Sequence, residues 1–518
     1  MPHQNAPNFR LDQRAAGVLL HPTSLPGPHG SGDLGPEAYA FIDFLADARV
    51  RWWQMLPHNP IGPGNSPYAS ASAFAGSPLM IDLKRLAEDG LLERGDLAGL
   101  QGAPGKVRFG PTIRHRHDRL RKAFAAFQSG GGTKKAEYRR FCEESGAWLE
   151  DFALFTACHE RSGYSPWSTW EAPLRDRHAD ALHAAREELA QEIEYQRFLQ
   201  YEFHRQWHLL RKHAHHRGVG LIGDVPIFVA HDSADVWQHR ELFTLDDRGR
   251  PTALTGCPPD HFNADGQLWG HPQFEWAAHE RTGFAWWVDR FRSLLRLFDA
   301  ARIDHFLGFH RVWWLAGNAK HARNGHWAPS PGDALFGATR QALGNVNIIA
   351  EDLGATTPEA FALRDKYGFP GMRIMSCGFG SDHPGAHYHL PHMYTPPCVA
   401  FTGTHDNETT VGWYQRVRQE HRAKRRAPGG EPSEYQRVER YFAKSDEPMV
   451  WRMIRSLYGS AANLIVIPMQ DLLELPARAR MNIPGTPEGN WEWRMPPGSL
   501  KPAMARKLAE FAAAYLRG

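Results

Sequence analysis

The chain has 518 residues, and its 60 basic and 57 acidic residues give a formal net charge of +3, which does not suggest nucleic acid or an anionic membrane as a partner. Five cysteines without C-x-x-C spacing argue against a disulfide framework or a thiolate metal site and favour a reducing compartment. No run approaches the roughly 18 apolar residues that span a bilayer, and the N-terminal sequence lacks the apolar core of a signal peptide. We therefore expect a cytoplasmic protein; the composition leaves its oligomeric state open.

Eight short apolar or β-branched segments recur along the chain, and each ends in polar, Gly or Pro residues. They are 16–22, 52–57, 218–226, 300–306, 345–354, 371–376, 398–407 and 463–471. Helix-like stretches at 36–48, 358–368 and 448–460 lie between them, each with a proline at or near its start. Alternating strands and helices predict parallel βα units, and eight of them predict a (β/α)8 TIM barrel. A doubly wound sheet is the alternative, but no G-x-G-x-x-G follows a strand.

Two intervals are too long for simple crossovers and predict insertions after strands 2 and 3. Residues 84–217 are charged and mainly helical in pattern, whereas residues 227–290 are loop-rich and aromatic. We expect residues 1–518 to form one catalytic barrel, with the second insertion near the active site. Tryptophans stand beside Gly, Pro and Asn in "GQLWGHP" and "GNWEWR". Flat aromatic faces in such loops suit ligands with apolar faces and polar rims, such as sugars.

Carboxylates stand at the ends of four predicted strands. They are Asp224, Asp304, Glu351 with Asp352, and Asp406. A lone acid at such a position is more often a helix cap or a salt-bridge partner. Four strands that deliver acids to the same end of a barrel are harder to explain in that way, because barrel enzymes place their active sites at the carboxyl ends of the strands.

Strand alternation assigns different environments to two of these carboxyl groups. Arg302 and Asp304 are two residues apart and share a face, so the arginine would keep Asp304 ionised. Glu351 ends the apolar run "NIIAE", where desolvation would raise its pKa and keep it protonated. One ionised and one protonated carboxyl group is the pair that glycoside chemistry requires. His305 would point to the opposite face, so we expect a structural or supporting role for it.

Other functions remain open at this point. An α-1,4-glucan hydrolase of the amylase type would use the same carboxyl pair. A metal-dependent hydrolase could use the rim carboxylates or the histidine clusters at 213–216 and 387–392, although clustered histidines without a third-ligand pattern are more often solvated. A sugar-binding protein would need no such pair, and the G-x-S-x-G elbow of serine hydrolases is missing.

The sequence resembles the amylomaltases, the bacterial 4-α-glucanotransferases also called disproportionating enzymes, which belong to the α-amylase-like clan of barrels. The resemblance runs from "GVLLHPTSLPGPHGSGDLG" to "MNIPGTPEGNWEWR" and includes "SPYASASAFAGSP", "GDVPIFVAHDSADVW", "FDAARIDHFLGF", "IIAEDLG" and "FTGTHDNETTVGW". It implies transfer of α-1,4-glucan segments between sugars, with no cofactor and no metal.

The resemblance also implies a retaining, two-step mechanism and a set of site residues. Asp304 of "RIDHF" would be the nucleophile, Glu351 of "AEDLG" the acid/base, and Asp406 of "THDN" the group that holds the sugar's hydroxyls. A retaining enzyme should separate the carboxyl groups of Asp304 and Glu351 by about 5–5.5 Å. The residues that we expect to bind substrate are Ser66, Tyr68, Asp224, Gln267, Trp269, Arg302, Asp352, His405 and Asn482.

Overall fold

Eight parallel strands close into a barrel at the centre of the molecule, in the order β1-β12-β11-β10-β9-β6-β3-β2. The structure is a computed structural model that describes residues 9–100, 105–259, 265–380, 385–423 and 430–518. The barrel strands are β1 (Ala15–Leu19), β2 (Trp52–Gln54), β3 (Gly220–Pro226), β6 (Ala300–Asp304), β9 (Ile348–Ala350), β10 (Gly371–Ile374), β11 (Cys398–Phe401) and β12 (Leu464–Pro468). Seven of them lie inside a predicted segment, and β1 begins one residue before the first segment, so the predicted (β/α)8 barrel is confirmed.

Burial explains why these strands appear in the sequence as continuous apolar runs. Every residue of β1, β11 and β12 is buried, because helices cover the outside of a parallel barrel while side chains fill its inside. The runs therefore lack the alternation of apolar and polar residues that a half-exposed strand would show.

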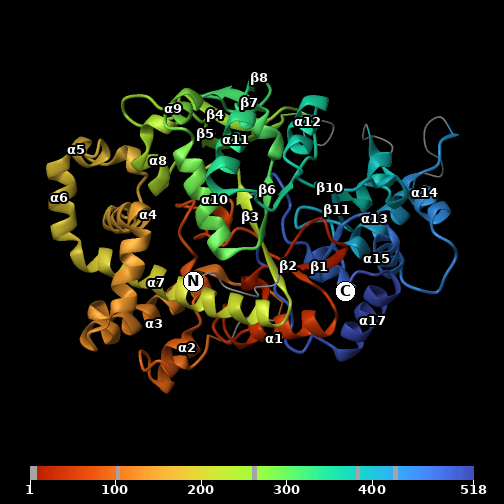
Figure 1. The fold of residues 1–518 in the computed structure, drawn as a ribbon, viewed down its shortest axis with the longest axis horizontal. Coiled ribbons are helices and arrows are strands. Elements are labelled where there is room, and N and C mark those ends of the chain that lie inside the picture. The colour runs from red at the N-terminus through yellow and green to blue at the C-terminus, as the bar shows by residue number, and fades with distance from the viewer. Residues whose placement is uncertain (1–8, 101–104, 260–264, 381–384, 424–429) are drawn as a thin grey trace.

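The helices surround the barrel and extend from it on two sides (Figure 1). They are α1 (Pro36–Asp47), α2 (Leu83–Glu88), α3 (Phe109–Ser129), α4 (Ala136–Arg161), α5 (Ala172–Arg175), α6 (Ala179–Glu188), α7 (Ala190–His216), α8 (Ala234–Gln238), α9 (Trp276–Arg281), α10 (Ala285–Leu297), α11 (Gly332–Leu343), α12 (Pro358–Lys366), α13 (Thr410–Ala423), α14 (Glu434–Tyr441), α15 (Met449–Gly459), α16 (Met469–Leu472) and α17 (Pro502–Ala514). The three predicted helices correspond to α1, α12 and α15, and proline opens α1 and α12 at the first helical position.

The chain between β2 and β3 is helical, as predicted for residues 84–217, and residues 101–104 of that interval lie outside the described part. Helices α3 to α6 form a lobe on the left of Figure 1. Helix α7 packs along α4 in this lobe and also contacts α1, α10 and β3. It therefore belongs to the helical layer of the barrel as well as to the lobe.

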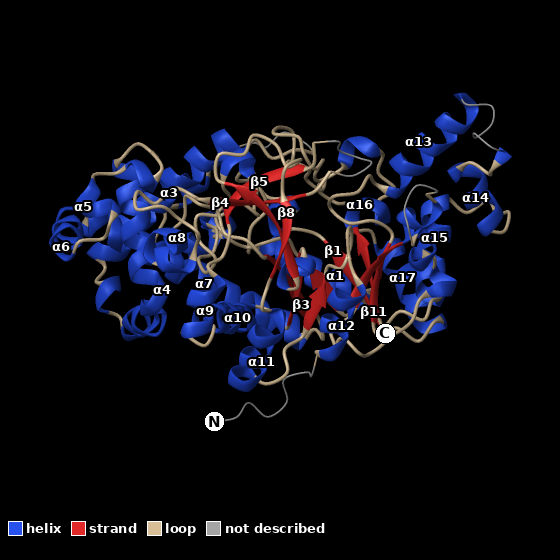
Figure 2. Cartoon of the chain, turned by 90° about the horizontal axis from the view of Figure 1, so that it is seen from above, coloured by secondary structure: helices blue, strands red, loops and turns tan. Residues whose placement is uncertain are grey.

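A second sheet of four antiparallel strands stands above one end of the barrel (Figure 2). Its order is β5-β4-β7-β8, and its strands are β4 (Ala253–Cys257), β5 (Gln267–Pro272), β7 (Arg311–Ala316) and β8 (His326–Pro329). Residues 227–290 contribute β4, β5 and helices α8 and α9, and α10 begins within this interval, with loops between these short elements. Residues 260–264 of the interval lie outside the described part. We call this sheet the upper sheet.

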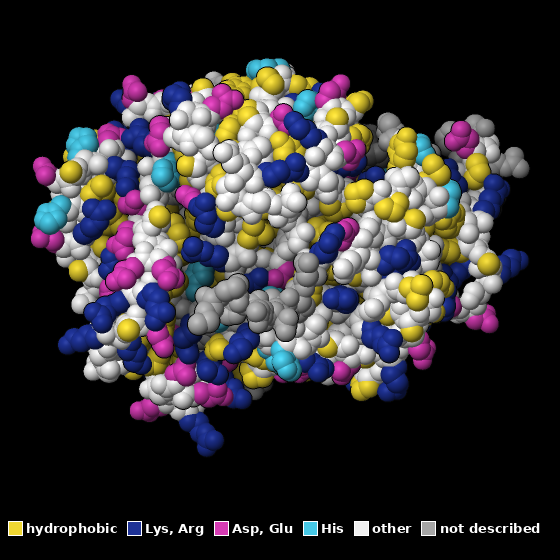
Figure 3. Space-filling model, in the orientation of Figure 1, with side chains coloured by type: hydrophobic (Ala, Val, Ile, Leu, Met, Phe, Trp, Pro, Cys, Tyr) yellow, Lys and Arg dark blue, Asp and Glu magenta, His cyan; other side chains and the backbone are white. Residues whose placement is uncertain are grey.

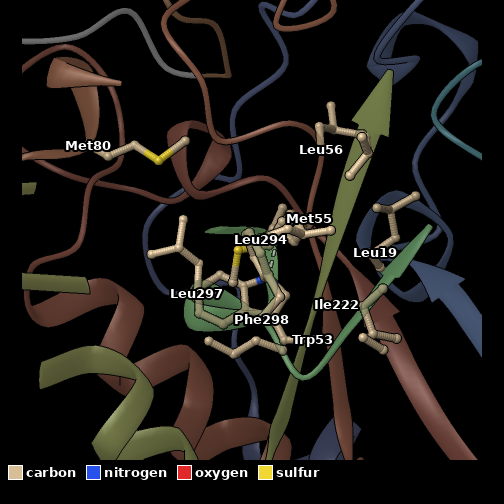
Figure 4. Close-up of a cluster of buried hydrophobic side chains, with 14 of the residues drawn as sticks. Leu19, Trp53, Met55, Leu56, Met80, Ile222, Leu294, Leu297 and Phe298 are labelled. Carbon is tan, nitrogen blue, oxygen red and sulfur yellow. Dashed lines mark hydrogen bonds between the residues drawn. The ribbon is translucent and has the colours of Figure 1, made fainter. Parts of the chain in front are cut away.

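A cluster of large apolar side chains joins the barrel to α10 (Figure 4). Leu19, Trp53 and Ile222 come from three neighbouring barrel strands, and Leu297 and Phe298 come from the end of α10. Trp53 is fully buried, and its Nε1–H donates to the carbonyl of Leu20 at 2.7 Å, so its one polar atom is satisfied. Burying each such side chain stabilises the fold by roughly 1.5–3 kcal/mol, which fixes the strand ends that carry the site.

The surface mixes both signs of charge. Basic and acidic side chains alternate over the face in Figure 3, without a large patch of one sign. Among the described residues, no helix is long and apolar enough to cross a membrane.

Candidate active site

A cleft of about 660 Å³ opens where the carboxyl ends of barrel strands meet the upper sheet. It collects side chains from the ends of β3, β6, β9 and β11, from β5, and from the loops around residues 66 and 482. The lining residues are Ser66, Tyr68, Ala69, Pro226, Ile227, Phe228, Gly266, Gln267, Leu268, Trp269, His271, Asp304, His305, Glu351, His405, Asp406, Asn482, Pro484, Gly485 and Trp491.

The structure brings most of the predicted site residues into this one cleft. Those that line it are Ser66, Tyr68, Gln267, Trp269, Asp304, Glu351, His405, Asp406 and Asn482. Asp224 and Arg302 are buried beside the lining residues and bond directly to them. Only Asp352 lies elsewhere.

Arg302 forms a double ion pair at the base of the cleft. In the barrel register Asp224 lies directly opposite Arg302 on the neighbouring strand, and the Nη1 of Arg302 donates to both carboxylate oxygens at 2.9 Å. Its Nη2 lies 2.9 Å from Oδ1 of Asp304, which is about one third exposed to the cleft. Burial alone would lower the pKa of Arg302, but Asp224 and Asp304 together raise it well above its usual value. Asp304 therefore faces the cleft with a permanent cation beside it, as strand alternation predicted.

Glu351 has the opposite environment. Burial raises the pKa of its carboxyl group to about 8, with Asp304 adding to the shift and Arg302 opposing it. The backbone N–H groups of His305 and Leu353 donate to its two oxygens at 2.7 and 3.0 Å and fix its orientation. Glu351 is thus mainly protonated at neutral pH, as the apolar run before it predicted.

His305 does not point away from the site. Its backbone adopts the left-handed region at φ 52°, which ends β6 and breaks the alternation on which the prediction depended. The imidazole lines the cleft and meets the ring of Trp269 edge to face, with centroids 4.9 Å apart. Burial lowers its pKa to about 4, so the ring is neutral at physiological pH. The same turn aims the N–H of His305 at Glu351, so the strained residue also orients that acid.

A hydrogen-bonded group continues the site on the other side of Arg302. The hydroxyl of Tyr68 donates to Oδ2 of Asp224 at 2.7 Å and lies 2.9 Å from Nε2 of His405. A phenol has one proton, so we assign the Nε2–H of His405 as the donor to Tyr68. Nε2 also lies 3.3 Å from Oδ2 of Asp406, whose Oδ1 accepts from the amide of Asn482 at 2.6 Å. One connected network therefore surrounds Asp406, and its other members are the predicted residues Asp224, Tyr68, His405 and Asn482.

Aromatic rings form two walls of the cleft. Tyr68 lies with its ring centroid 5.5 Å from that of Trp491, and Phe228 lies 5.9 Å from Trp269. The Nε1–H of Trp269 donates to the side-chain oxygen of Gln267 at 3.1 Å. Sequence reasoning did not place Trp491 or Phe228 in the site, although the tryptophan-rich "GNWEWR" was a usable signal for the first. Trp491 has a φ of 66°, a strained conformation for a bulky residue.

Asp352 is buried outside the cleft, so the structure does not support its expected contact with substrate. Its Oδ1 accepts from the N–H of Met372 at 2.7 Å, and its other oxygen pairs with Arg364 of α12. Asp352 lacks the positive φ that turns His305 into the cleft, so it points to the face opposite Glu351.

The histidine clusters make local contacts of their own. In the cluster at 213–216, His213 pairs with Asp43 at 2.9 Å and His215 with Asp299 at 3.0 Å. In the cluster at 387–392, Nδ1 of His389 accepts from the N–H of Ile374 and Nδ1 of His392 lies beside the hydroxyl of Tyr441, both at 3.1 Å. In the described part of the chain, no three His, Cys, Asp or Glu side chains are grouped so that they could hold a metal ion.

A closed parallel barrel, an ion-paired aspartate, a protonated glutamate and aromatic walls together define an enzyme that acts on glycosidic bonds. Residues 20–501 match the family model described as 4-alpha-glucanotransferase. The chain is 43% identical to the 4-alpha-glucanotransferase of Thermus thermophilus, over 97% of this chain and 99% of that one, and 42% identical to that of Synechocystis sp., over 98% and 99%. It superposes on the amylomaltase of Streptococcus agalactiae in complex with acarbose with a TM-score of 0.90 and 38% identity, covering 98% of this chain and 100% of that one. The chain belongs to the 4-alpha-glucanotransferase family.

Proposed function

We propose that this enzyme moves α-1,4-glucan segments from a donor maltodextrin to the 4-hydroxyl of an acceptor glucan or glucose, by a retaining double displacement. The observation that carries the proposal is the pair of carboxyl groups in one cleft, with Asp304 beside the cation of Arg302 and Glu351 held protonated by burial. Family membership supports glucan transfer, and the S. agalactiae relative was solved with acarbose.

In the first step, a carboxylate oxygen of Asp304 attacks the anomeric carbon of the donor sugar. The bond to the leaving 4-oxygen breaks, and Glu351 gives its proton to that oxygen. The products are a glucosyl ester on Asp304 and a shortened glucan with a free 4-hydroxyl. Positive charge develops on the sugar ring in the transition state, and the carboxylate of Asp406 would hold neighbouring hydroxyls while it does so.

In the second step, Glu351 is ionised and acts as the base. It removes the proton from the acceptor's 4-hydroxyl, whose oxygen attacks the anomeric carbon and releases Asp304. The acceptor's proton restores the acid form of Glu351, so the cycle closes without an external proton. Two inversions at one carbon give overall retention of the α configuration.

The remaining lining residues support binding of the two sugars. Tyr68 and His405 lie beside Asp406 and would contact the donor sugar at the scissile bond. Gln267 and Trp269 of β5, and Ser66 in the loop beside Tyr68, also line the cleft and would receive the acceptor. A bound acceptor sugar over these residues keeps water away from the glucosyl ester, which is the condition for transfer rather than hydrolysis.

We also propose that the reaction takes place in the cytoplasm. The cysteine side chains at 142, 158, 377 and 398 are free thiols in the structure, which is compatible with a reducing compartment.

Incubation with maltotriose tests the proposal. We expect glucose and a ladder of longer oligosaccharides, with the total number of reducing ends unchanged, because each transfer breaks one glycosidic bond and makes another. A steady rise in reducing ends would contradict it and favour an amylase-type hydrolase. The absence of any product would favour a sugar-binding protein, and a rise in reducing ends that excess chelator abolishes would favour metal-dependent hydrolysis.

A further inference from the structure

One short loop carries two of the cleft residues without support from a strand or helix of its own. Residues 403–409 connect β11 to α13 and bring His405 and Asp406 to the cleft. We call this segment the Asp406 loop. Its internal bonds are a turn in which the backbone and hydroxyl of Thr404 both donate to the side chain of Asn407, at 2.8 and 2.9 Å. These bonds shape the turn, but they do not fix it relative to the barrel.

A buried carboxylate closes the neck of the Asp406 loop. Thr402 at the end of β11 and Thr410 at the start of α13 both donate their hydroxyls to Oδ2 of Asp471, at 2.5 and 2.7 Å. The backbone N–H of Thr410 donates to Oδ1 of the same group at 2.7 Å. Asp471 is 1% exposed and lies in α16, which directly follows β12, the strand that pairs with β11. A buried group on this neighbouring helix therefore fixes both ends of the loop.

An arginine outside the cleft holds the tip of the loop. Arg480 donates through Nη2 to the backbone carbonyl of Asp406 and through Nε to that of Asn482 at 2.6 Å. The side chain of Asn482 in turn donates to the carboxylate of Asp406, and its N–H donates to the carbonyl of His405 at 3.0 Å. One guanidinium therefore fixes the backbones of both partners in the contact between Asn482 and Asp406. Arg480 is not among the residues that line the cleft.

We propose that Asp471 and Arg480 are positioning residues that hold the carboxylate of Asp406 at the reacting sugar, one at the neck of its loop and the other at its tip. The inference rests on the proposed role of Asp406 in the transition state. The carboxylate of Asp406 would act when positive charge develops on the sugar ring in the transition state. It must already be in position at that point, because moving it there would add to the activation free energy. Loosening the loop should therefore lower kcat while changing KM for the ground-state sugar little.

Substitutions of Arg480 test whether this arginine positions the tip of the Asp406 loop. Arg480→Gln should lower kcat for maltotriose by about 10- to 100-fold with KM within a few-fold of wild type. Arg480→Lys keeps the charge and one donor, so it should recover part of the loss. Arg478→Gln changes an exposed arginine two residues away and should leave kcat unchanged. Wild-type kcat in Arg480→Gln, or a rise in KM alone, would overturn the inference.

A double-mutant cycle with Asp406→Asn separates positioning from general destabilisation. If Arg480 acts through Asp406, Arg480→Gln should cost less than about 3-fold once Asp406→Asn is present. An undiminished cost in that background would overturn the inference. Wild-type turnover in Asp406→Asn itself would instead refute the proposed role of Asp406, whereas an inactive Asp406→Asn beside a fully active Arg480→Gln would refute only the positioning.

Two substitutions of Thr402 test the contact of Asp471 with the neck of the Asp406 loop. They also test the inference if Arg480→Gln does not fold. Thr402→Val keeps the shape and removes the hydroxyl, so it should lower kcat several-fold. Thr402→Ser keeps the hydroxyl and removes a buried methyl group, so it should restore kcat although its Tm falls. If kcat follows Tm across the pair instead of following the hydroxyl, Asp471 has only a structural role and the inference fails for the neck.

Discussion

The barrel rim and the upper sheet build opposite sides of the same cleft in different ways. On the rim, Asp304 and Glu351 stand at strand ends and are fixed by buried partners such as Arg302. On β5 of the upper sheet, Leu268 and Gly270 are exposed, and the hydrogen bond between Gln267 and Trp269 stays within the strand. The rim thus has the rigidity and controlled charge that catalysis requires, whereas the sheet offers an adaptable surface. We therefore expect changes on the rim to affect turnover and changes on the sheet to affect which acceptor is used.

The largest expected effect is at the rim. Asp304→Asn removes the nucleophile but keeps its size, so no glucosyl-enzyme can form. We expect kcat for maltotriose to fall by about 10⁴-fold or more. The far-UV circular dichroism spectrum and Tm should stay close to those of wild type.

Asp289→Asn is the matched control for this substitution. Asp289 lies on the surface of α10 and pairs with Arg292, so its change should leave kcat unaltered. Substantial turnover in Asp304→Asn would place the nucleophile elsewhere and remove the functional distinction between rim and sheet.

The rim was predictable from sequence for a physical reason. Parallel barrel strands are short, buried and contiguous, so each appears as an apolar run followed by its functional residue. Strand register could then place Arg302 beside Asp304, and burial could set the pKa of Glu351. The prediction failed where the backbone left the extended region, at His305, and where alternation was not applied past the strand end, at Asp352.

The upper sheet was not predictable in the same way. Strand β4 pairs with β7, which lies more than fifty residues further along the chain, and no local pattern specifies such a partner. Trp491 and Phe228 enter the cleft from loops, outside any strand or helix. Their aromatic character was visible in the sequence, but the direction in which they point was not.

Glu351 gives the next largest effect and a pH signature. The first step needs its proton, so kcat/KM should fall as pH rises through about 8, the pKa set by burial. Glu351→Gln should lower kcat by about 10²- to 10⁴-fold and remove this limb from the pH profile. A wild-type limb that persists in Glu351→Gln would assign it to another group.

The same carboxyl group predicts how stability depends on pH. Its native pKa of about 8 lies above the ordinary value of 4.5, so the native state holds the proton more tightly than the unfolded chain between these values. Its contribution to the free energy of unfolding should therefore decline as pH rises across that window. The difference in Tm between wild type and Glu351→Gln, measured from pH 5 to 8, checks the sign.

Two ion pairs, one at the barrel rim and one near the upper sheet, show how the loss of an ion pair affects the free energy of unfolding when the charges are buried and when they are exposed. Arg302→Met leaves Asp224 buried without its cation and should lower the free energy of unfolding by about 3–5 kcal/mol. Arg323→Met removes the partner of Asp265 near the upper sheet, where both side chains are more than half exposed, and should cost less than about 1 kcal/mol. Urea denaturation of both variants measures the difference, and equal losses would contradict the assignment of rigidity to the rim.

The smallest expected effect concerns the upper sheet, and it decides whether acceptor choice resides there. Trp269→Ala removes an aromatic face from the cleft wall, so we expect the acceptor's KM to rise about 10-fold, equivalent to ~1.4 kcal/mol, and the share of hydrolysis to increase. Trp327→Ala is the control, because Trp327 lies on β8 at the far edge of the same sheet and packs against Trp313 outside the cleft. Both variants remove a half-buried tryptophan from the upper sheet. If both change the product pattern in the same way, the stability of the sheet controls transfer. A change confined to Trp269→Ala would mean that direct contact with the acceptor sugar controls it, and would separate acceptor selection on the sheet from bond cleavage on the rim.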